Sequence, residues 1–326
     1  MKAASVPEVV SGSSPSTPAG AAPRRSRRPE GRRLRDLLIA LPWITPALVL
    51  IIGVVLFPTM IMFYNSTREI SRSGVDRGSA GIDNFVEVFT FGSFVPILLR
   101  TIVWVVVVVA FTVVISLGLA QFLNKAFPGR KLVRMAIVVP WAASVVMTTL
   151  VVYYGLEPYF GIVNKFLVDV GLVTDPEGFG WTRNPGTAFA WSIVIAIFVS
   201  LPFTTYTILA GLQSVPGEVL EAAKMDGAGP VRTYFGVVLP QLRAAVSVAV
   251  LINIINVFNS LPILKVMTGS LPGYDADTIM TMIFKYIQVQ NKIDVASALS
   301  VVNFVIVLLI VAVYLRIVRP TKEIGE

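Results

Sequence analysis

The 326-residue chain contains no cysteine and no histidine, and only 14% of its residues are charged. These absences exclude disulfides, thiol chemistry, cysteine or histidine metal ligands and every catalytic triad that depends on histidine. Neither a G-x-x-x-x-G-K-[ST] run nor a G-x-G-x-x-G run is present, so no loop is suited to cradle nucleotide phosphates. We therefore expect no catalytic residue, no metal and no cofactor in this chain, and any ATP that it depends on must bind to another chain.

Hydrophobic residues, by contrast, make up 55% of the sequence and gather in long runs. A helix needs about 20 apolar residues to cross a bilayer core about 30 Å thick. Six runs are long enough, at 37–65, 97–123, 133–155, 187–211, 243–266 and 294–317. The sequence thus predicts an all-α polytopic membrane protein with six transmembrane helices. The first run carries Pro42, Pro46 and Pro58, which we expect to bend the helix, with an early end of the helix as the alternative.

The tails and loops divide the chain into four parts. Residues 1–35 are rich in Ser, Pro and Ala and then in Arg, which predicts a disordered basic tail. Residues 36–96 hold the first transmembrane helix and an external loop. Residues 97–318 hold a core of five transmembrane helices, and 319–326 form a second tail. The external loops contain many Gly, Pro and Asn residues, which favours turns with short interfacial helices.

The distribution of basic residues predicts the orientation. About two thirds of the Lys and Arg fall on one side if the N-terminus is cytoplasmic. Because cytoplasmic loops carry an excess of these residues, we expect both termini and the 212–242 loop inside a multi-pass protein of the cytoplasmic membrane. The basic tail can contact anionic lipid or serve only to fix this topology. We expect no nucleic-acid partner.

The 212–242 loop is the most informative segment. Pro216 and Glu218 suit the first turn of a helix over about 216–225, and Asp226-Gly227 suits its end. Gly229-Pro230 begins a second helix with one apolar face, made of Val231, Tyr234, Phe235, Val238 and Leu239. Small residues at the bend would let another protein approach the backbone closely. An interfacial hairpin without a partner is the alternative on local chemistry alone.

The same loop resembles the E-A-A-x3-G-x9-I-x-L-P motif of ABC importer permeases. It reads Glu221-Ala222-Ala223, then Gly227, then Val237-x-Leu239-Pro240, with valine for isoleucine as the one departure. From about residue 40 onward the chain is also similar to the maltose-type "F" permease of the carbohydrate branch, in Phe57-Pro58, in Gly81-Ile82-Asp83-Asn84-Phe85 and in Asn256, Phe258 and Asn259. The T-G-G-x-P loop of that subtype differs here, as Thr268-Gly269-Ser270-Leu271-Pro272.

This resemblance implies the type I ABC importer permease fold, with a cytoplasmic coupling helix between the fourth and fifth spans. Glu221 would make the polar contact with an ATPase subunit, Ala222 and Ala223 would pack against it, and Gly227 would shape the bend. Asp226, Leu239 and Pro240 complete the implied coupling set. Two ATPase subunits that bind Mg-ATP, an external solute-binding protein and a second permease of the different "G" type are the implied partners, and a homodimer is the alternative. Closure of the ATPases would drive alternating access.

Polar side chains recur along two of the predicted spans. In the fifth, Asn253, Asn256 and Asn259 recur at every third position with Ser260 beside them, and the sixth holds Ser297, Ser300 and Asn303 at the same spacing. Such residues are costly in a bilayer unless they face a partner or a watery cavity. Amides both donate and accept hydrogen bonds, as sugar hydroxyls require. We predict a sugar pathway lined by Asn253, Asn256, Asn259, Ser260, Ser300 and Asn303, with hydrogen bonds between helices as the alternative.

The expected function is that of a permease subunit translocating a mono- or oligosaccharide. Another small polar solute, such as glycerol phosphate, is the alternative within the same class. An intramembrane hydrolase would need paired buried carboxylates, which the apolar runs lack. A channel or a structural subunit would leave the 212–242 motif without a role. Trp141, Tyr153, Tyr154 and Trp191 suit interface anchors or stacking on sugar rings.

Overall fold

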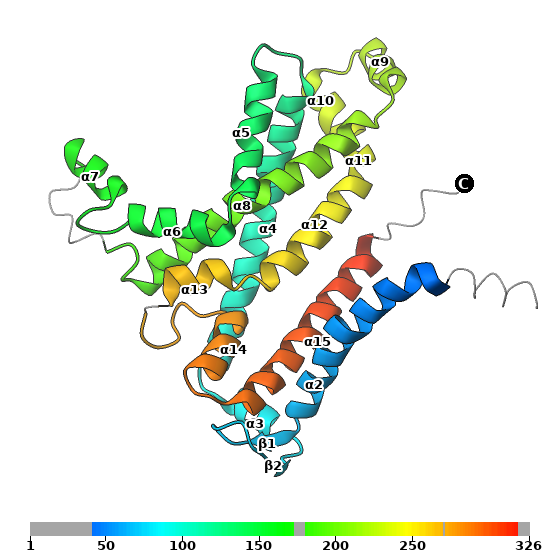
Figure 1. Ribbon diagram of the computed structural model, residues 1–326. Coiled ribbons are helices and arrows are strands. Elements are labelled where there is room, and N and C mark those ends of the chain that lie inside the picture. Colours follow the sequence, from blue (N-terminus) through cyan, green and yellow to red (C-terminus); the bar gives the residue numbers. More distant parts are fainter. Residues whose placement is uncertain (1–40, 173–179, 270, 319–326) are drawn as a thin grey trace, which may run out of the picture. The chain divides into compact units, whose positions relative to one another are not determined.

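The computed structural model describes residues 41–172, 180–269 and 271–318 (Figure 1). The predicted tails at 1–35 and 319–326 lie outside these residues. By its internal contacts the chain divides into two units, Met1–Pro58 and Thr59–Glu326. The first described helix, Leu41–Asn65, contains the π-helical stretch η1 (Ile51–Leu56), followed by α2 (Phe57–Asn65). Pro58 lies inside this helix and does not end it; the wide π turn before it accommodates a residue without an N–H.

After α2 the chain forms one small hairpin and a series of helices. In chain order they are β1 (Arg68–Ile70), β2 (Asp76–Ser79), α3 (Asp83–Thr90), α4 (Phe94–Asn124), α5 (Arg130–Ala142), α6 (Val145–Gly155), α7 (Ile162–Asp169), α8 (Pro185–Gln213), α9 (Gly217–Met225), α10 (Pro230–Thr233), η3 (Tyr234–Val238), α11 (Leu239–Gln241), α12 (Arg243–Phe258), α13 (Pro262–Thr268), α14 (Ile279–Gln288) and α15 (Ile293–Val318).

The antiparallel hairpin of β1 and β2 corrects the prediction of an all-α chain. Arg68 and Asp76 form an ion pair across it at 2.9 Å, and the guanidinium of Arg68 lowers the pKa of Asp76 below its ordinary value. The Asn84 side chain donates to the carbonyls of Ser66 and Arg68, and the Ile70 N–H donates to Asp294 at the start of α15. Strands of three and four residues are too short to show an alternating pattern, so they could not be predicted from the sequence.

Four helices of the described residues are long and apolar enough to cross a membrane, and two bent pairs raise the number to as many as six. Leu41–Asn65, α4, α8 and α15 match the first, second, fourth and sixth predicted spans within a few residues. The third predicted span, 133–155, is not one straight helix, because α5 and α6 meet at an angle of 94°. Ala143 and Ser144 take extended backbone between them, three residues after Pro140.

The fifth predicted span, 243–266, is also broken. Helix α12 ends at Phe258, and α13 starts with Pro262 in its first turn, where a missing N–H is tolerated. The stretch Pro230–Gln241 precedes α12 at an angle of 68°. The count of six spans therefore stays a prediction, since it requires each bent pair to be counted as one crossing.

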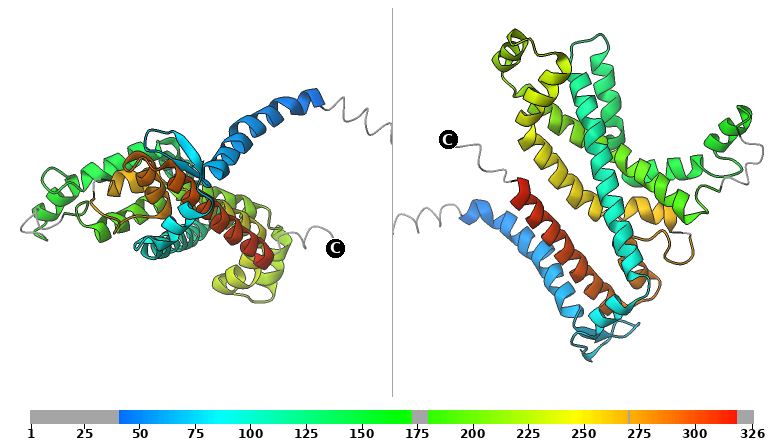
Figure 2. Two further views of the ribbon diagram at one scale, coloured as in Figure 1. Left: turned by 90° about the horizontal axis from the view of Figure 1, so that it is seen from below. Right: turned by 180° about the vertical axis from the view of Figure 1, so that it is seen from behind.

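Helices α4 and α8 pack along one another and form the centre of the second unit. The Thr205 hydroxyl of α8 donates to Ser116 Oγ of α4 at 3.1 Å, and both side chains are buried. Helix α12 lies close to α8, since a methyl group added at Gly211 would stand 2.6 Å from the Cβ of Ala245. Within this unit, α9 lies at one end of α4, and β1, β2 and α3 lie at the other (Figures 1 and 2).

Candidate functional site

Residues 212–242 form a helix, a tight turn and a second helical stretch. At the end of α9 the Gly227 N–H donates to the Lys224 carbonyl, and the Ala228 N–H donates to the Ala223 carbonyl, both at 3.0 Å. This pair of bonds is a Schellman cap, and Gly227 supplies the positive φ, 74°, that the cap requires. Pro230 then starts α10 at its first position. These observations confirm the predicted helix, its end at Asp226-Gly227 and the restart at Gly229-Pro230.

A small apolar cluster holds the base of this element. Val238 and Leu242 are buried together with residues from the ends of α4 and α8, namely Ala120, Leu123, Ile208, Leu209 and Leu212. The apolar face predicted for the second helix is only partly correct, because Val231 and Phe235 are exposed. Over η3 the helix is π-helical, so its residues depart from the 3.6-residue spacing on which the prediction rested.

The predicted coupling residues differ in their exposure. Glu221, Ala222, Asp226, Gly227 and Pro240 are exposed, whereas Ala223 is buried and Leu239 is half-buried. A cleft of about 400 Å³ separates parts of this element from the end of α4, with Gln121, Asn124, Lys224 and Tyr234 in its lining. The element thus presents α9 outward while its base is fixed by the apolar cluster. Its contact with an ATPase stays a prediction.

A second cleft, of about 420 Å³, lies between α8 and α12 and is closed on one side by the junction of α5 and α6. Its lining is Trp141, Val145, Ala196, Val199, Ser200, Phe203, Ile252, Asn253, Asn256, Val257, Ser260 and Ile263. No charged side chain is among them. The Trp104 indole, which is buried, donates to the Val257 carbonyl at 2.9 Å and fixes the end of α12 beside the cleft.

The predicted pathway asparagines of α12 have different surroundings. Asn253 is buried, and its Nδ2 donates to Thr204 Oγ1 of α8 and to the Ala249 carbonyl, both at 2.8 Å. Asn256 is exposed, lines the cleft and has no side-chain hydrogen bond to any described residue. Asn259 is exposed and donates to the Ile255 carbonyl, but it does not line the cleft. Asn253 therefore fits the helix-to-helix alternative, and Asn256 and Ser260 are free to meet a solute.

Ser300 and Asn303 do not line this cleft. The Ser300 hydroxyl donates to the Ala296 carbonyl within α15. Asn303 is buried, and its Nδ2 lies 3.9 Å from Met280 Sδ of α14. Within this chain α15 turns these two side chains toward itself and α14, and their place in a sugar pathway stays a prediction.

Trp141, Ser200 and Phe203 are among the lining residues that lay outside the predicted pathway. From the sequence, Trp141 was considered only as a membrane-interface anchor or as a ring that stacks on a sugar. Ser200 and Phe203 were not singled out. Ser200 and Thr204 are four residues apart in a predicted span, so one helical turn of hydroxyls was a signal that could have drawn attention to this face of α8. The approach of Trp141 depends on the bend between α5 and α6, which the sequence did not reveal.

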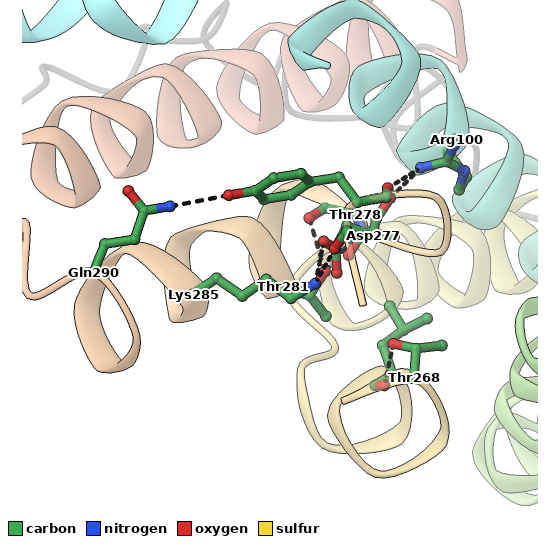
Figure 3. A network of polar contacts seen from close by, with 10 residues as sticks. Arg100, Thr268, Asp277, Thr278, Thr281, Lys285 and Gln290 are labelled. Carbon is green, nitrogen blue, oxygen red and sulfur yellow. Dashed lines mark hydrogen bonds and ion pairs between the residues drawn. The ribbon is translucent and has the colours of Figure 1, made fainter. Parts of the chain in front are cut away.

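The loop that follows α13 leads into a buried polar network (Figure 3). Lys285 Nζ lies 2.6 Å from Asp277 Oδ2, and the Asp277 side chain is 2% exposed. Arg100 of α4 donates to the carbonyls of Tyr274 and Asp277. Thr278 and Thr281 form a capping box at the start of α14. The network ties the loop to α4 and was not predicted, because Arg100 lies 174 residues before Tyr274, to whose carbonyl it donates.

Residues 82–320 match the family described as "binding-protein-dependent transport system inner membrane component". The chain belongs to this family. It is accordingly a multi-pass membrane permease, and the resemblance stated from its motifs is confirmed.

Several relatives are similar over most of their length. A probable ABC transporter permease protein of Brucella suis biovar 1 is 35% identical over 280 residues, 86% of this chain and 96% of that protein. The sulfoquinovosyl glycerol transport system permease protein SmoG of Agrobacterium fabrum is 31% identical over 89% of this chain and 93% of its own length. The trehalose/maltose transport system permease protein MalF of Thermococcus litoralis is 26% identical over 89% and 97%.

Among solved structures, a bacterial ABC transporter involved in the import of the acidic polysaccharide alginate contains a similar chain. Its TM-score is 0.77 at 20% identity, and the match covers 90% of this chain and 99% of that chain. At this level of identity the likeness supports the fold. The chain thus has the helical ABC importer permease fold, and it contains the small hairpin of β1 and β2.

Proposed function

We propose that this chain is a permease subunit of an ATP-driven importer and translocates a neutral sugar by alternating access. Two of the relatives are named for sugar-containing solutes, sulfoquinovosyl glycerol and trehalose or maltose. Those names describe the relatives. For this chain, the substrate class has to be argued from its own cleft.

The cleft between α8 and α12 carries the proposal. It offers the amide of Asn256, the hydroxyls of Ser200 and Ser260 and the indole of Trp141, and no charged side chain. A sugar ring presents hydroxyls at its edge and C–H groups on its faces, so amides and hydroxyls can bond its edge while an aromatic ring packs against its face. A charged solute would lose its hydration here without gaining a counter-charge.

Active transport requires that an ATPase subunit drives a change in this cleft. We assign the contact with that subunit to α9. Glu221 and Ala222 stand exposed on α9, and Gly227 keeps the turn that links α9 to α10. From there η3 leads through α11 and Leu242 into α12, the helix that carries Asn256. A displacement of α9 would therefore act on one wall of the cleft through helical segments joined by the turn at Gly227 and by the 68° bend before α12.

The proposed assembly contains two ATPase subunits, this chain, a second and different permease, and an external solute-binding protein. ATP and Mg²⁺ bind to the ATPases. The excess of Lys and Arg favours a cytoplasmic location for α9 and for both termini. The binding protein would then deliver the sugar at the end of the chain that carries β1, β2 and α3.

Uptake by the assembled transporter in proteoliposomes tests the proposal. With its binding protein present and ATP inside, radiolabelled neutral oligosaccharides should accumulate and labelled glycerol 3-phosphate should not. Glycerol phosphate is the second candidate, because a sn-glycerol-3-phosphate transport system permease of Yersinia pestis is 23% identical over 81% of this chain. Accumulation of the phosphate ester alone would overturn the assignment of a neutral sugar.

A further inference from the structure

The first turns of α5 gather three cations around a cleft that the transport mechanism does not use. The cleft measures about 500 Å³ and is lined by Ala126, Phe127, Gly129, Arg130, Lys131, Leu132 and Arg134. No carboxylate is among the lining residues. Within the described part of the chain, none of these three cations belongs to an ion pair. The cleft therefore holds a concentrated positive charge without a counter-ion.

Arg134 gives the strongest indication that an anion belongs here. Its Nε and Nη2 atoms are buried, and neither has a hydrogen-bond partner among the described residues. A buried guanidinium without an acceptor is strongly unfavourable, because it loses its hydration and gains nothing in return. The Tyr206 hydroxyl of α8 donates to the Arg134 carbonyl at 2.9 Å, which fixes this turn of α5 against α8.

An apolar cleft continues from Arg134 along α5. It measures about 410 Å³ and is lined by Arg134, Met135, Val138, Val139, Ala142 and Tyr206. Leu132, Met135 and Val139 are exposed by 69%, 65% and 61%. Helices α5 and α6 together are long and apolar enough for a membrane span. The exposed apolar residues therefore belong to a segment suited to the bilayer. Arg134 lines both clefts and joins the basic one to the apolar one.

We infer that these two clefts bind one anionic phospholipid of the surrounding bilayer. Its headgroup phosphate lies among Arg130, Lys131 and Arg134, and an acyl chain follows Met135, Val138 and Val139. A lipid fits because it carries a strong hydrogen-bond acceptor and an apolar chain in one molecule, in the order in which the clefts follow one another. Guanidinium groups are suited to phosphate by their geometry and permanent charge. The inference rests on the chain's location in a membrane and not on its substrate.

Native mass spectrometry of the assembled transporter tests this site. The complex is stripped of lipid in detergent and titrated with phosphatidylglycerol, with phosphatidylcholine or with inorganic phosphate. We expect saturable binding of phosphatidylglycerol, with an affinity about fivefold lower for each cation removed in Arg130→Gln and Arg134→Gln. Lys125→Gln is the matched control, because it removes a cation from the same loop that does not line the cleft.

Four outcomes would overturn the inference. They are equal binding of phosphatidylcholine, full displacement of the lipid by millimolar inorganic phosphate, unchanged binding in Arg130→Gln, and the same loss in Lys125→Gln. If Arg134→Gln fails to assemble, Arg130→Gln still decides the matter, since Arg130 is only half-buried and forms no ion pair in the described residues. Occupation of the clefts by the second permease would appear as an assembled complex that binds no phosphatidylglycerol at all.

Discussion

Asn253 and Asn256 lie nearly one turn apart on α12, yet only Asn253 uses its amide on protein partners. Asn253→Leu should therefore lower the stability of the chain by about 1 kcal/mol, because Thr204 loses a partner inside the bundle. Asn256→Leu should leave stability unchanged and reduce the initial rate of sugar uptake about tenfold, the effect of leaving a solute hydroxyl unpaired. Thermal unfolding in detergent and uptake in proteoliposomes separate the two.

Ile252→Val is the control for both asparagine variants, because it changes the same wall of the cleft without touching a polar group. If Asn256→Leu transports at the wild-type rate, Asn256 has no part in the pathway and the cleft loses its main polar group. A reversal of the pattern, with Asn256→Leu unstable and Asn253→Leu impaired only in transport, would show that the two positions have been assigned the wrong roles.

The ion pair of Asp277 and Lys285 offers a second prediction for single residues. The Asp277 side chain is 2% exposed and that of Lys285 is 20% exposed. Asp277→Asn leaves the Lys285 ammonium without its counter-charge and should destabilise the chain by about 3 kcal/mol. The exposed pair of Arg77 and Glu69 is the matched control, and Glu69→Gln should cost less than about 1 kcal/mol. Equal decreases of the melting temperature in the two variants would contradict the larger contribution to stability that we assign to the buried ion pair.

At the same scale, the sequence indicated the cleft only in part. Asn253 and Asn256 reach it because they share one face of α12, as their spacing predicted, whereas Ser260 lines it from the segment after that helix. Asn259 follows the same spacing but falls at the end of α12, where the helix stops and the face is no longer maintained. Trp141 could not be assigned, because its position depends on a bend between two helices rather than on a periodic pattern.

Among the elements, the turn between α9 and α10 depends on one residue. Gly227→Pro removes the N–H that donates to Lys224 and cannot adopt a φ of 74°. We expect the variant to insert and assemble but to lose ATP-driven uptake by at least about tenfold, because α9 loses its fixed direction. Uptake and the amount of assembled complex are measured on the same membranes.

Gly229→Ala is the control for that turn. Gly229 has a negative φ of −66°, and nothing lies within 4 Å of an added methyl group. It should transport normally. Wild-type uptake by Gly227→Pro would remove the coupling role from α9, whereas loss in both variants would point to general sensitivity of the loop and not to the Schellman cap.

The contact of α8 with α12 gives a prediction about packing. Gly211→Ala places a methyl group 2.6 Å from the Cβ of Ala245, and neither backbone can yield without moving a helix. A loss of about 1–3 kcal/mol is expected, in the range of overpacked cores. Gly118→Ala on α4 has open space and should change little. The melting temperatures of the two variants in detergent are compared. A lower value for Gly211→Ala alone indicates that α8 and α12 pack too closely for an added methyl group, and equal values would contradict this.

Helical elements were predicted where a long apolar run coincides with one straight helix, as in α4, α8 and α15. The predictions failed where the chain bends inside such a run. Ala143-Ser144 separates α5 from α6, and residues 259–261 separate α12 from α13. Pro140 and Ser144 near the first break are too common in membrane helices to predict a bend of 94°. The π-helical stretches η1 and η3 were also invisible, because a change from 3.6 residues per turn needs no special residue.

For the whole molecule, the family and the helical fold could be reached from the sequence, because the motif from Glu221 to Pro240 is long and the apolar runs are distinct. The orientation of the chain and its partners rest on basic-residue counts and on that motif. Both depend on contacts with the membrane and with other chains, which the sequence of one chain does not contain. Glu221 and Ala222 are exposed on α9. They form the surface that we propose contacts the ATPase.

Site-specific photo-crosslinking in native membranes tests this central claim most directly. A photoreactive amino acid replaces Ala222 on α9 or, as the control, Arg77 on β2, and the crosslinked proteins are identified by mass spectrometry. If α9 is the coupling element, Ala222 captures an ATPase with a nucleotide-binding motif and Arg77 does not. Capture of the ATPase from Arg77 alone, or of no ATPase from Ala222 in transporters that take up sugar, would contradict the account.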